Sequence, residues 1–277
     1  MDWEAVKQPA GLKILYGSTA SRSILDRLNL IWTLLWQSFV PRNKRESMKL
    51  VWVFLEPAGQ LAVLVIVFSL VGKTADYGRS FPIFLLTGIS MLTLYNAASQ
   101  SVAVAVISLP SPVRLPHIGL FHDAIAQLLF AWITTFLSVL LIWGFITWYE
   151  GHATMPQDWF RCLGALGLAG FLGFGMGMIR GYCKQFIPAL DRIYTVFRRA
   201  LLFISGIFYV PSFLPPFFRD ALAWNPILQA VEMNRKGFYG EDYPSIVFSL
   251  EYLVTFVLSA VTFGMLLLWF ERRRIMG

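Results

Sequence analysis

An apolar stretch interrupted by prolines, residues 193–245, constrains the fold more than any other part of the chain. The interrupting residues are Pro211, Pro215 and Pro216. They cannot lie inside one regular helix, because proline lacks an N–H donor and its ring clashes with the preceding turn. The residues around them are nevertheless as apolar as a membrane span, and non-helical backbone at membrane depth is tolerated only where protein or a water-filled cavity covers it. The stretch therefore predicts a membrane helix over 196–212, followed by a re-entrant pair of half-helices over 213–240.

The composition indicates that most of the chain is surrounded by lipid. Of the 277 residues, 57% are hydrophobic and 14% are charged, whereas soluble domains carry about 25% charged residues. Runs of about 20 apolar residues match the length that one helix needs to cross a bilayer. The sequence therefore predicts an all-α membrane protein with six transmembrane helices. Their predicted ranges are 51–71, 81–109, 124–149, 160–179, 196–212 and 246–270.

Residues 24–39, which precede the first predicted span, carry apolar side chains at helical spacing, with polar residues on the opposite side. Trp32 and Trp36 lie on the apolar side, and tryptophan is enriched where a membrane meets water. The pattern predicts an amphipathic helix that lies on the membrane surface; packing against a soluble partner is the alternative, and both arrangements can hold together. We therefore divide the chain into a cytoplasmic arm with this interface helix, residues 1–48, and a transmembrane domain, residues 49–277.

The net charge of +7 is distributed unevenly. In a six-span arrangement, 17 of the 23 lysines and arginines fall on one face of the membrane. Cytoplasmic loops carry such an excess, so both termini are predicted to be cytoplasmic. Because the positive charge follows the membrane topology, it does not indicate a nucleic-acid partner.

Polar residues lie inside two of the predicted spans. Glu56 lies in the first, and an intramembrane carboxylate is a candidate functional group by default; solvation, or pairing with Lys49 or Arg45, is the alternative that we favour. The second span contains Asn96, Ser99, Gln100 and Ser101. Small and polar residues commonly mediate helix packing in membranes, and we favour that role for them over lining a pore.

Glycines recur along the predicted fourth span, in the patterns Gly173-x-x-x-Gly177 and Gly177-x-x-x-Gly181. This spacing lets a neighbouring helix approach closely. It predicts a packing face, either inside one subunit or across a dimer.

A family resemblance rests on the order SGIFY over 205–209, then the proline-rich break, then WNPILQAVEMNRKGFY over 224–239. This order resembles the permease subunits of ABC-type exporters of capsular polysaccharide, and the resemblance extends more weakly over nearly the whole chain. It implies a homodimer in the bacterial inner membrane, with a continuous channel between the protomers. It also implies two cytoplasmic ATPase subunits, which would hold the ATP and Mg, and a periplasm-spanning co-polymerase as a further partner.

The same resemblance suggests where a polysaccharide would pass. The first and fifth spans of such exporters lie closest to the dimer axis, which makes Phe203, Phe208 and Tyr209 channel candidates. Arg219, Arg235 and Lys236 are predicted near the outer mouth, where they could meet a lipid-linked acidic polysaccharide; a solvated surface explains them equally well. We expect the re-entrant segment to close the channel at rest.

The loop SLPSPVRLPHIGLFHDA, residues 108–124, follows the second span. In ABC exporters the equivalent loop forms a coupling helix that docks in a cleft of the ATPase, and the resemblance implies that role here. The residues that we assign to this contact are Leu115, His117, Phe121 and His122 from the loop, with Trp32 and Trp36 from the amphipathic helix. The two histidines are more readily explained as interface groups than as metal ligands.

Catalytic patterns are not visible in the sequence: it has no paired carboxylates in a soluble cleft, no Ser/His/Asp arrangement and no metal-ligand spacing. We therefore predict no catalytic centre and no cofactor within this chain. The alternatives to capsule export are an exporter of another glycan, such as O-antigen or teichoic acid, and a membrane enzyme that processes glycans.

Overall fold

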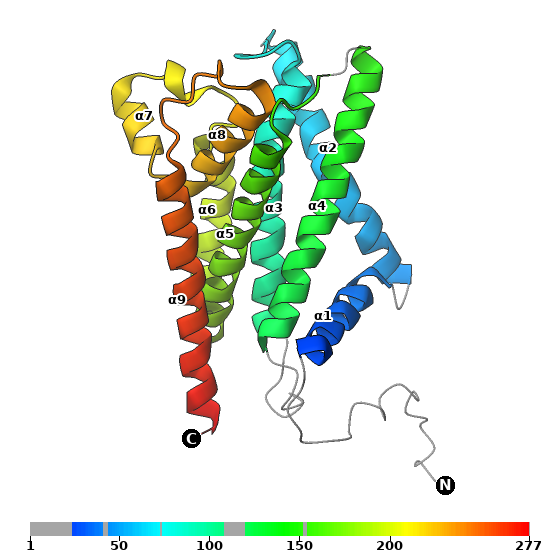
Figure 1. Cartoon of the computed structure of the whole chain (residues 1–277), viewed down its shortest axis with the longest axis vertical. Coiled ribbons are helices and arrows are strands. Elements are labelled where there is room, and N and C mark those ends of the chain that lie inside the picture. Colours follow the sequence, from blue (N-terminus) through cyan, green and yellow to red (C-terminus); the bar gives the residue numbers. More distant parts are fainter. Residues whose placement is uncertain (1–23, 41–43, 73, 108–119, 152–153, 277) are drawn as a thin grey trace.

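The computed structural model describes residues 24–40, 44–72, 74–107, 120–151 and 154–276, and over these residues the chain forms helices and turns without strands (Figure 1). The helices are α1 (Ile24–Phe39), α2 (Lys44–Leu70), α3 (Phe81–Ile107), α4 (Leu120–Glu150), α5 (Trp159–Phe186), α6 (Pro188–Ile204), the 3₁₀ turn η3 (Pro211–Phe213), α7 (Pro216–Leu222), α8 (Pro226–Tyr239) and α9 (Leu250–Met276). The predicted all-helical class is confirmed for this part of the chain.

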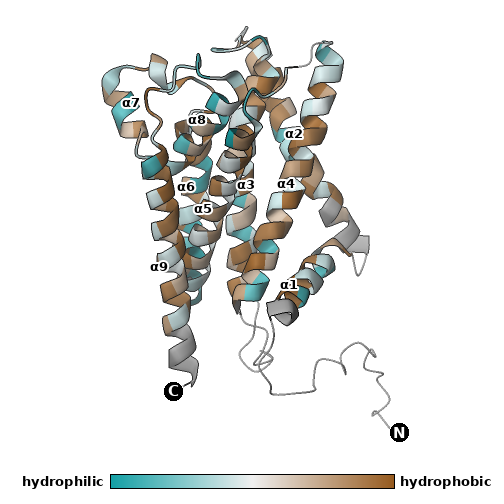
Figure 2. Cartoon of the chain, viewed as in Figure 1, coloured by the Kyte–Doolittle hydropathy of each residue, from teal (hydrophilic) through white to brown (hydrophobic). Residues whose placement is uncertain are grey.

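Five of these helices are long and apolar enough to cross a membrane. The segments are Val51–Leu70, Phe81–Ile107, Phe121–Glu150, Trp159–Phe186 and Leu250–Phe270, and they overlap five of the six predicted ranges. Hydrophobic residues predominate along the middle of α2, α4 and α9 (Figure 2). The structure is therefore that of a multi-pass membrane protein.

The helix predicted over 196–212 has different bounds in the structure. Here α6 begins at Pro188, which occupies the first helical turn, where proline is favoured because its missing N–H has no helical partner. The helix ends at Ile204, and Gly206 then takes a φ of +68°, a left-handed conformation that glycine adopts readily. The chain thus leaves the helix before Pro211, and α6, with 17 residues and charged side chains in both halves, is not among the five long apolar segments.

The centre of the bundle is the contact of α3 with α5, made by the glycines of α5. A Cβ on Gly173 would lie 2.6 Å from the carbonyl oxygen of Tyr95, and one on Gly177 would lie 2.9 Å from that of Ser99. Only glycine permits backbones to approach this closely. The predicted glycine packing face is therefore confirmed, and it lies inside one subunit.

Helix α1 packs beside α4 through one of its faces. Leu35 is buried, the Phe39 and Phe130 ring centroids are 4.9 Å apart, and the Gln127 amide donates to the Ser38 hydroxyl over 3.5 Å. In Figure 1, α1 and the C-terminal end of α9 lie at one end of the bundle, whereas α7 and α8 lie at the other.

Between those two short helices, Asn225 begins α8: its side-chain oxygen accepts from the Ile227 N–H over 3.0 Å. Most residues of α8 are buried, although the helix carries several polar side chains. They are held in the interior by the hydrogen bonds described below.

Candidate functional site

A polar cavity of about 640 Å³ lies between α2, α3, α4 and α6. We call it the chamber. Its polar lining consists of Glu56, Gln60, Thr93, Asn96, Gln100, Ser101, Thr134, Thr135, Ser138, Arg198 and Arg199. Three of the four helices that line it are long and apolar enough to cross a membrane, so polar side chains gather here between membrane-length helices.

The hydroxyl and amide groups of the chamber differ in what they offer a ligand. The Thr134 hydroxyl donates to the Phe130 carbonyl over 2.7 Å, and that of Ser138 to the Thr134 carbonyl over 2.8 Å. Each hydroxyl hydrogen is used within α4, and both side chains are almost fully buried, so these two residues form the wall of the chamber and offer it no donor. The Asn96 Oδ1 atom is buried and has no hydrogen-bond partner among the described residues. A hydroxyl group of a ligand would satisfy this acceptor.

Charge in the chamber comes from Glu56 on α2 and from Arg198 and Arg199 on α6. Arg198 is half-buried, and within the described part of the chain neither arginine has an ion-pair partner. Guanidinium groups at membrane depth usually face a water-filled space or pair with an anion. The chamber therefore offers two cationic donors to a ligand.

Polar contacts hold α6 at its first turns. Asp191 accepts from Arg180 Nε over 2.6 Å and pairs with Lys184 Nζ over 2.9 Å, and both partners lie on α5. One turn further on, the Tyr194 hydroxyl donates to the Tyr95 hydroxyl on α3 over 3.0 Å. The beginning of α6 is therefore fixed to the centre of the bundle.

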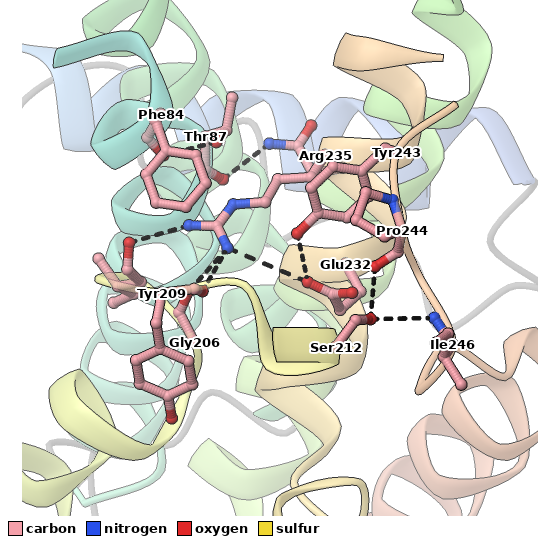
Figure 3. A network of polar contacts seen from close by, with 12 residues as sticks. Phe84, Thr87, Gly206, Tyr209, Ser212, Glu232, Arg235, Tyr243, Pro244 and Ile246 are labelled. Carbon is pink, nitrogen blue, oxygen red and sulfur yellow. Dashed lines mark hydrogen bonds and ion pairs between the residues drawn. The ribbon is translucent and has the colours of Figure 1, made fainter. Parts of the chain in front are cut away.

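The other end of α6 continues into a turn that Arg235 of α8 holds (Figure 3). Arg235 Nη1 donates to the carbonyl oxygens of Gly206 over 2.7 Å and Tyr209 over 3.0 Å. Its Nη2 donates to the Ile207 carbonyl over 2.9 Å. The guanidinium carbon lies 3.8 Å from the centre of the Phe84 ring, a cation–π geometry. We call residues 206–209 the carbonyl turn.

A buried carboxylate accompanies this arginine. Glu232 Oε1 accepts from the Tyr243 hydroxyl over 2.8 Å and lies 4.0 Å from Arg235 Nη1 (Figure 3). The side chains of Glu232 and Arg235 are both 0% exposed. Charge balance therefore accompanies the hydrogen bonds in this part of the interior.

A model of the ABC-2 type transporter family matches residues 29–239. The chain belongs to this family. The resemblance predicted from the sequence is therefore confirmed. Among similar proteins, the polysialic acid transport protein KpsM of Escherichia coli is 24% identical over 216 residues, which cover 78% of this chain and 83% of KpsM.

Two further relatives carry names from capsule export. The capsule polysaccharide export inner-membrane protein CtrC of Neisseria meningitidis serogroup B is 22% identical over 234 residues, covering 83% of this chain and 87% of CtrC. The capsule polysaccharide export inner-membrane protein BexB of Haemophilus influenzae is 22% identical over 262 residues, covering 90% of this chain and 94% of BexB.

The predicted channel aromatics of this ABC-2 family member lie in different surroundings. Phe203 lines the chamber and is 63% exposed. Phe208 is 7% exposed, because its ring packs between those of Phe68 and Phe203 at centroid distances of 5.1 and 5.7 Å. The Tyr209 hydroxyl donates to the Phe203 carbonyl over 3.1 Å. Phe203 is thus the one of the three that faces the chamber.

The three cations predicted at the outer mouth also lie in different surroundings. The expectation that Arg235 meets an acidic polymer is not met, because its guanidinium is fully buried and donates to backbone carbonyls. Arg219 lies on α7 beside Asp220, at 3.3 Å. Lys236 donates to Glu241 over 2.8 Å. Only the latter two reach the surface.

Glu241 is a carboxylate shared by two cations near α8. The pKa of Glu241 lies below its ordinary value, mainly because its carboxylate accepts a hydrogen bond from Lys236 and also accepts one from Arg161 at 2.6 Å. Both contacts favour the charged carboxylate. Glu241 itself lies outside the membrane-length helices, and its contact with Arg161 links the first turn of α5 to the loop after α8.

The residues assigned to ATPase contact are described in part. Trp32 and Trp36 are exposed, and their rings stack with centroids 6.5 Å apart. Phe121 and His122 are half-buried in the first turn of α4, the helix that α1 packs against. Leu115 and His117 lie outside the described residues.

The sequence interpretation underestimated the polar residues of α3. Ser99 does mediate packing, since its hydroxyl is 3.1 Å from that of Tyr194. Asn96, Gln100 and Ser101 instead line the chamber. Asn96 and Gln100 are four residues apart and so share one face of the helix, and this periodicity was readable from the sequence.

Proposed function

We propose that this chain is the permease subunit of an ATP-driven ABC exporter that moves a capsular polysaccharide across the bacterial inner membrane. The observation that carries the proposal is the chamber, a space lined by polar side chains between membrane-length helices of a member of the ABC-2 family. It holds two arginines that have no ion-pair partner among the residues that the structure describes. The names of the related KpsM, CtrC and BexB proteins support capsular polysaccharide as the substrate class.

The proposed topology has six spans, with both termini in the cytoplasm and residues 49–277 as the transmembrane domain. Helix α6 has 17 residues, which extend about 25 Å at 1.5 Å per residue, and together with the carbonyl turn it forms the proposed fifth span, with α9 as the sixth. Helices α7 and α8 form the re-entrant pair on the outer side, and α1 within residues 1–48 lies at the inner membrane surface. The grouping of α1 with the C-terminal end of α9 at one end of the bundle supports this orientation (Figure 1).

In the proposed homodimer, a second copy closes the open side of the chamber. Both α2 and α6 also carry exposed apolar side chains that such a contact would cover. They include Val63, Ile66 and Val67 on α2, and Ile193, Val196 and Phe203 on α6. Two chambers facing one another would make a continuous path, and Phe203 would offer an apolar face to sugar rings.

The energy for transport is proposed to come from two copies of a cytoplasmic ATPase, which bind ATP and Mg. Trp32 and Trp36 on α1, with Phe121 and His122 on α4, form part of the proposed docking surface, and Leu115 and His117 are proposed to join them. A periplasmic co-polymerase is the proposed partner on the outer side, where Arg219 and Lys236 lie.

We propose that the contact with an acidic, lipid-linked polymer lies in the chamber instead of at the outer mouth. Arg198 and Arg199 replace Arg235 in this role, because they are the cations without partners among the described residues of the chamber. Guanidinium groups bind carboxylates and phosphates with charge-assisted hydrogen bonds.

The test is reconstitution in proteoliposomes with the ATPase encoded beside this chain. The expected result is a complex of two copies of each subunit that hydrolyses ATP and moves a capsular polysaccharide across the bilayer. A chain that recruits no ATPase would overturn the proposal. A working complex that moves only O-antigen or teichoic acid would retain the exporter and change its substrate.

A further inference from the structure

The carbonyl turn exposes acceptors that a continuous helix would have used internally. A helix leaves its last carbonyl groups without partners, and the left-handed Gly206 directs the chain away from α6 at this point. Arg235 reaches across from α8 and satisfies three of these carbonyls at distances between 2.7 and 3.0 Å (Figure 3). A single side chain therefore determines where the turn lies.

Unused hydrogen-bonding capacity lies next to this contact. Arg235 Nε and Glu232 Oε2 are buried, and neither has a hydrogen-bond partner among the described residues. Buried polar atoms are nearly always paired, so each exception calls for an explanation. Here one atom is a donor and the other an acceptor, and their side chains are three residues apart on one helix, with 4.0 Å between Nη1 and Oε1. Once the carbonyls were released, the Nη1–Nη2 fork of Arg235 could meet both oxygens of Glu232 as a bidentate pair, the strongest geometry available to arginine and carboxylate.

We propose that Arg235 is a positioning residue with two arrangements. In one it holds the carbonyl turn, as described here; in the other it releases the turn and pairs with Glu232. This inference rests on the proposed function, because the turn joins α6, which lines the chamber, to the re-entrant helices α7 and α8. Transport requires the turn to move, and the second arrangement permits that movement.

The physical reason for two arrangements is the burial of the charge. A guanidinium group that lost the three carbonyls and gained nothing would be left buried and unpaired, which is strongly unfavourable. Glu232 removes most of that cost, since its second oxygen is available and Phe84 remains beside the cation in either arrangement. Tyr243 opposes the transfer, because its hydroxyl occupies Glu232 Oε1.

Movement of the carbonyl turn would shift a residue that lines the chamber. The Tyr209 hydroxyl is bonded to the Phe203 carbonyl, which belongs to the last turn of α6. Asn225 also donates to the Ile204 carbonyl over 3.1 Å from the start of α8. The end of α6 and the carbonyl turn therefore move together, and Phe203 moves with them.

Hydrogen exchange of residues 205–211, measured on the full chain in lipid nanodiscs, separates the two arrangements. Arg235→Lys loses the planar fork and should raise exchange in the turn about tenfold, as expected for the loss of a charge-assisted bond. Tyr243→Phe frees Glu232 and should also raise it, whereas Glu232→Gln removes the second partner and should leave it unchanged or lower. Lys236→Met, the neighbouring cation that bonds Glu241 instead, is the matched control and should have no effect.

A positioning role is distinguished from simple support of the fold by this difference: exchange in the turn rises in Arg235→Lys but does not rise in Glu232→Gln. If Glu232→Gln raised exchange in the turn as much as Arg235→Lys does, the inference would be overturned. If Glu232→Gln does not fold, Tyr243→Phe decides alone: unchanged exchange in the turn would equally overturn it.

Transport by the complete complex with its ATPase gives a second measurement. Glu232→Gln should lower glycan export at least tenfold while ATP hydrolysis per complex is retained. Without the carboxylate, Arg235 stays on the carbonyl turn, and the end of α6 cannot move with each cycle of ATP hydrolysis. A parallel loss of export and hydrolysis would indicate a structural role and contradict the inference. If the wild-type complex exported no glycan, the proposed function would fail, and the exchange measurement would still decide between one arrangement of Arg235 and two.

Discussion

Asp191 and Arg180 form an ion pair of 2.6 Å that ties the first turn of α6 to α5. Both side chains are largely withdrawn from solvent, at 19% and 10% exposed. At the far end, Asn225 and Arg235 hold the last turn and the carbonyl turn. Helix α6 is thus fastened at two points, and the two arginines of the chamber lie between them.

Replacement of Asp191 by Asn should weaken the contact that holds the first turn of α6 to α5. A charge-assisted hydrogen bond is lost while Arg180 and Lys184 keep their charges, so we expect unfolding to become easier by about 1–3 kcal/mol. Thermal unfolding of the purified chain measures this. Arg192→Gln, an exposed position on the same helix, is the control. Equal stability of the two variants would contradict the assigned role of Asp191.

The glycine face of α5 should tolerate no methyl group where it meets α3. Gly173→Ala places a Cβ 2.6 Å from a backbone oxygen, and overpacking of this kind costs about 1–3 kcal/mol. Gly167→Ala on the same helix is the control, because its Cβ meets nothing within 4 Å. The unfolding temperature of Gly173→Ala should therefore be lower than that of Gly167→Ala. An equal loss of stability in Gly167→Ala would contradict the packing assigned to Gly173.

The chamber arginines should affect transport more than stability. Arg198→Gln and Arg199→Gln each remove a charge-assisted contact worth about 1.5–3 kcal/mol, so export of an acidic glycan should fall about tenfold or more for each. ATP hydrolysis in the reconstituted complex and the yield of folded protein should stay near those of Arg192→Gln. Export at the wild-type rate in both variants would remove these residues from the path.

The contact made by Glu241 should depend on pH in one direction. Its pKa lies below the ordinary value of 4.5 because Lys236 and Arg161 favour the charged form. The stabilisation is therefore complete above pH 4.5 and is lost as the pH falls through the lower, folded-state pKa. The carboxylate is exposed, so the effect is small and screened by salt. The stability difference between the wild type and Glu241→Gln should shrink on acidification and at high salt; a difference that grew in acid would contradict this assignment.

The sequence predicted the parts of the fold that depend on local pattern. Apolar runs located five of the helices, and the spacing of Gly173 and Gly177 revealed a packing face without knowledge of its partner. The bounds of α6 were wrong because the most apolar window was taken as the helix. Pro188 and Asp191, a proline and an acidic residue in a first turn, are start signals that point to the bounds found in the structure.

The candidate site was less accessible from sequence, for a physical reason. Arg235 follows from no local pattern, because its burial depends on carbonyls that the turn at Gly206 releases from a different segment. The chamber likewise requires four helices to be placed before Asn96 and Arg198 are seen to share a space. Helical periodicity identified which residues share one face of a helix, but the identity of the opposite wall is a tertiary property.

The most direct measurement is the labelling of single cysteines in the chamber of the working complex. Asn96→Cys and Thr93→Cys, with Asp242→Cys in the exposed loop between α8 and α9 as control, would be made in a background lacking Cys162 and Cys183. If the chamber conducts the glycan, a membrane-impermeant thiol reagent reacts at both chamber positions, and transported polysaccharide protects them but not the control. Chamber cysteines that stay unlabelled, or that label equally with and without polysaccharide, would show that the polymer takes another route.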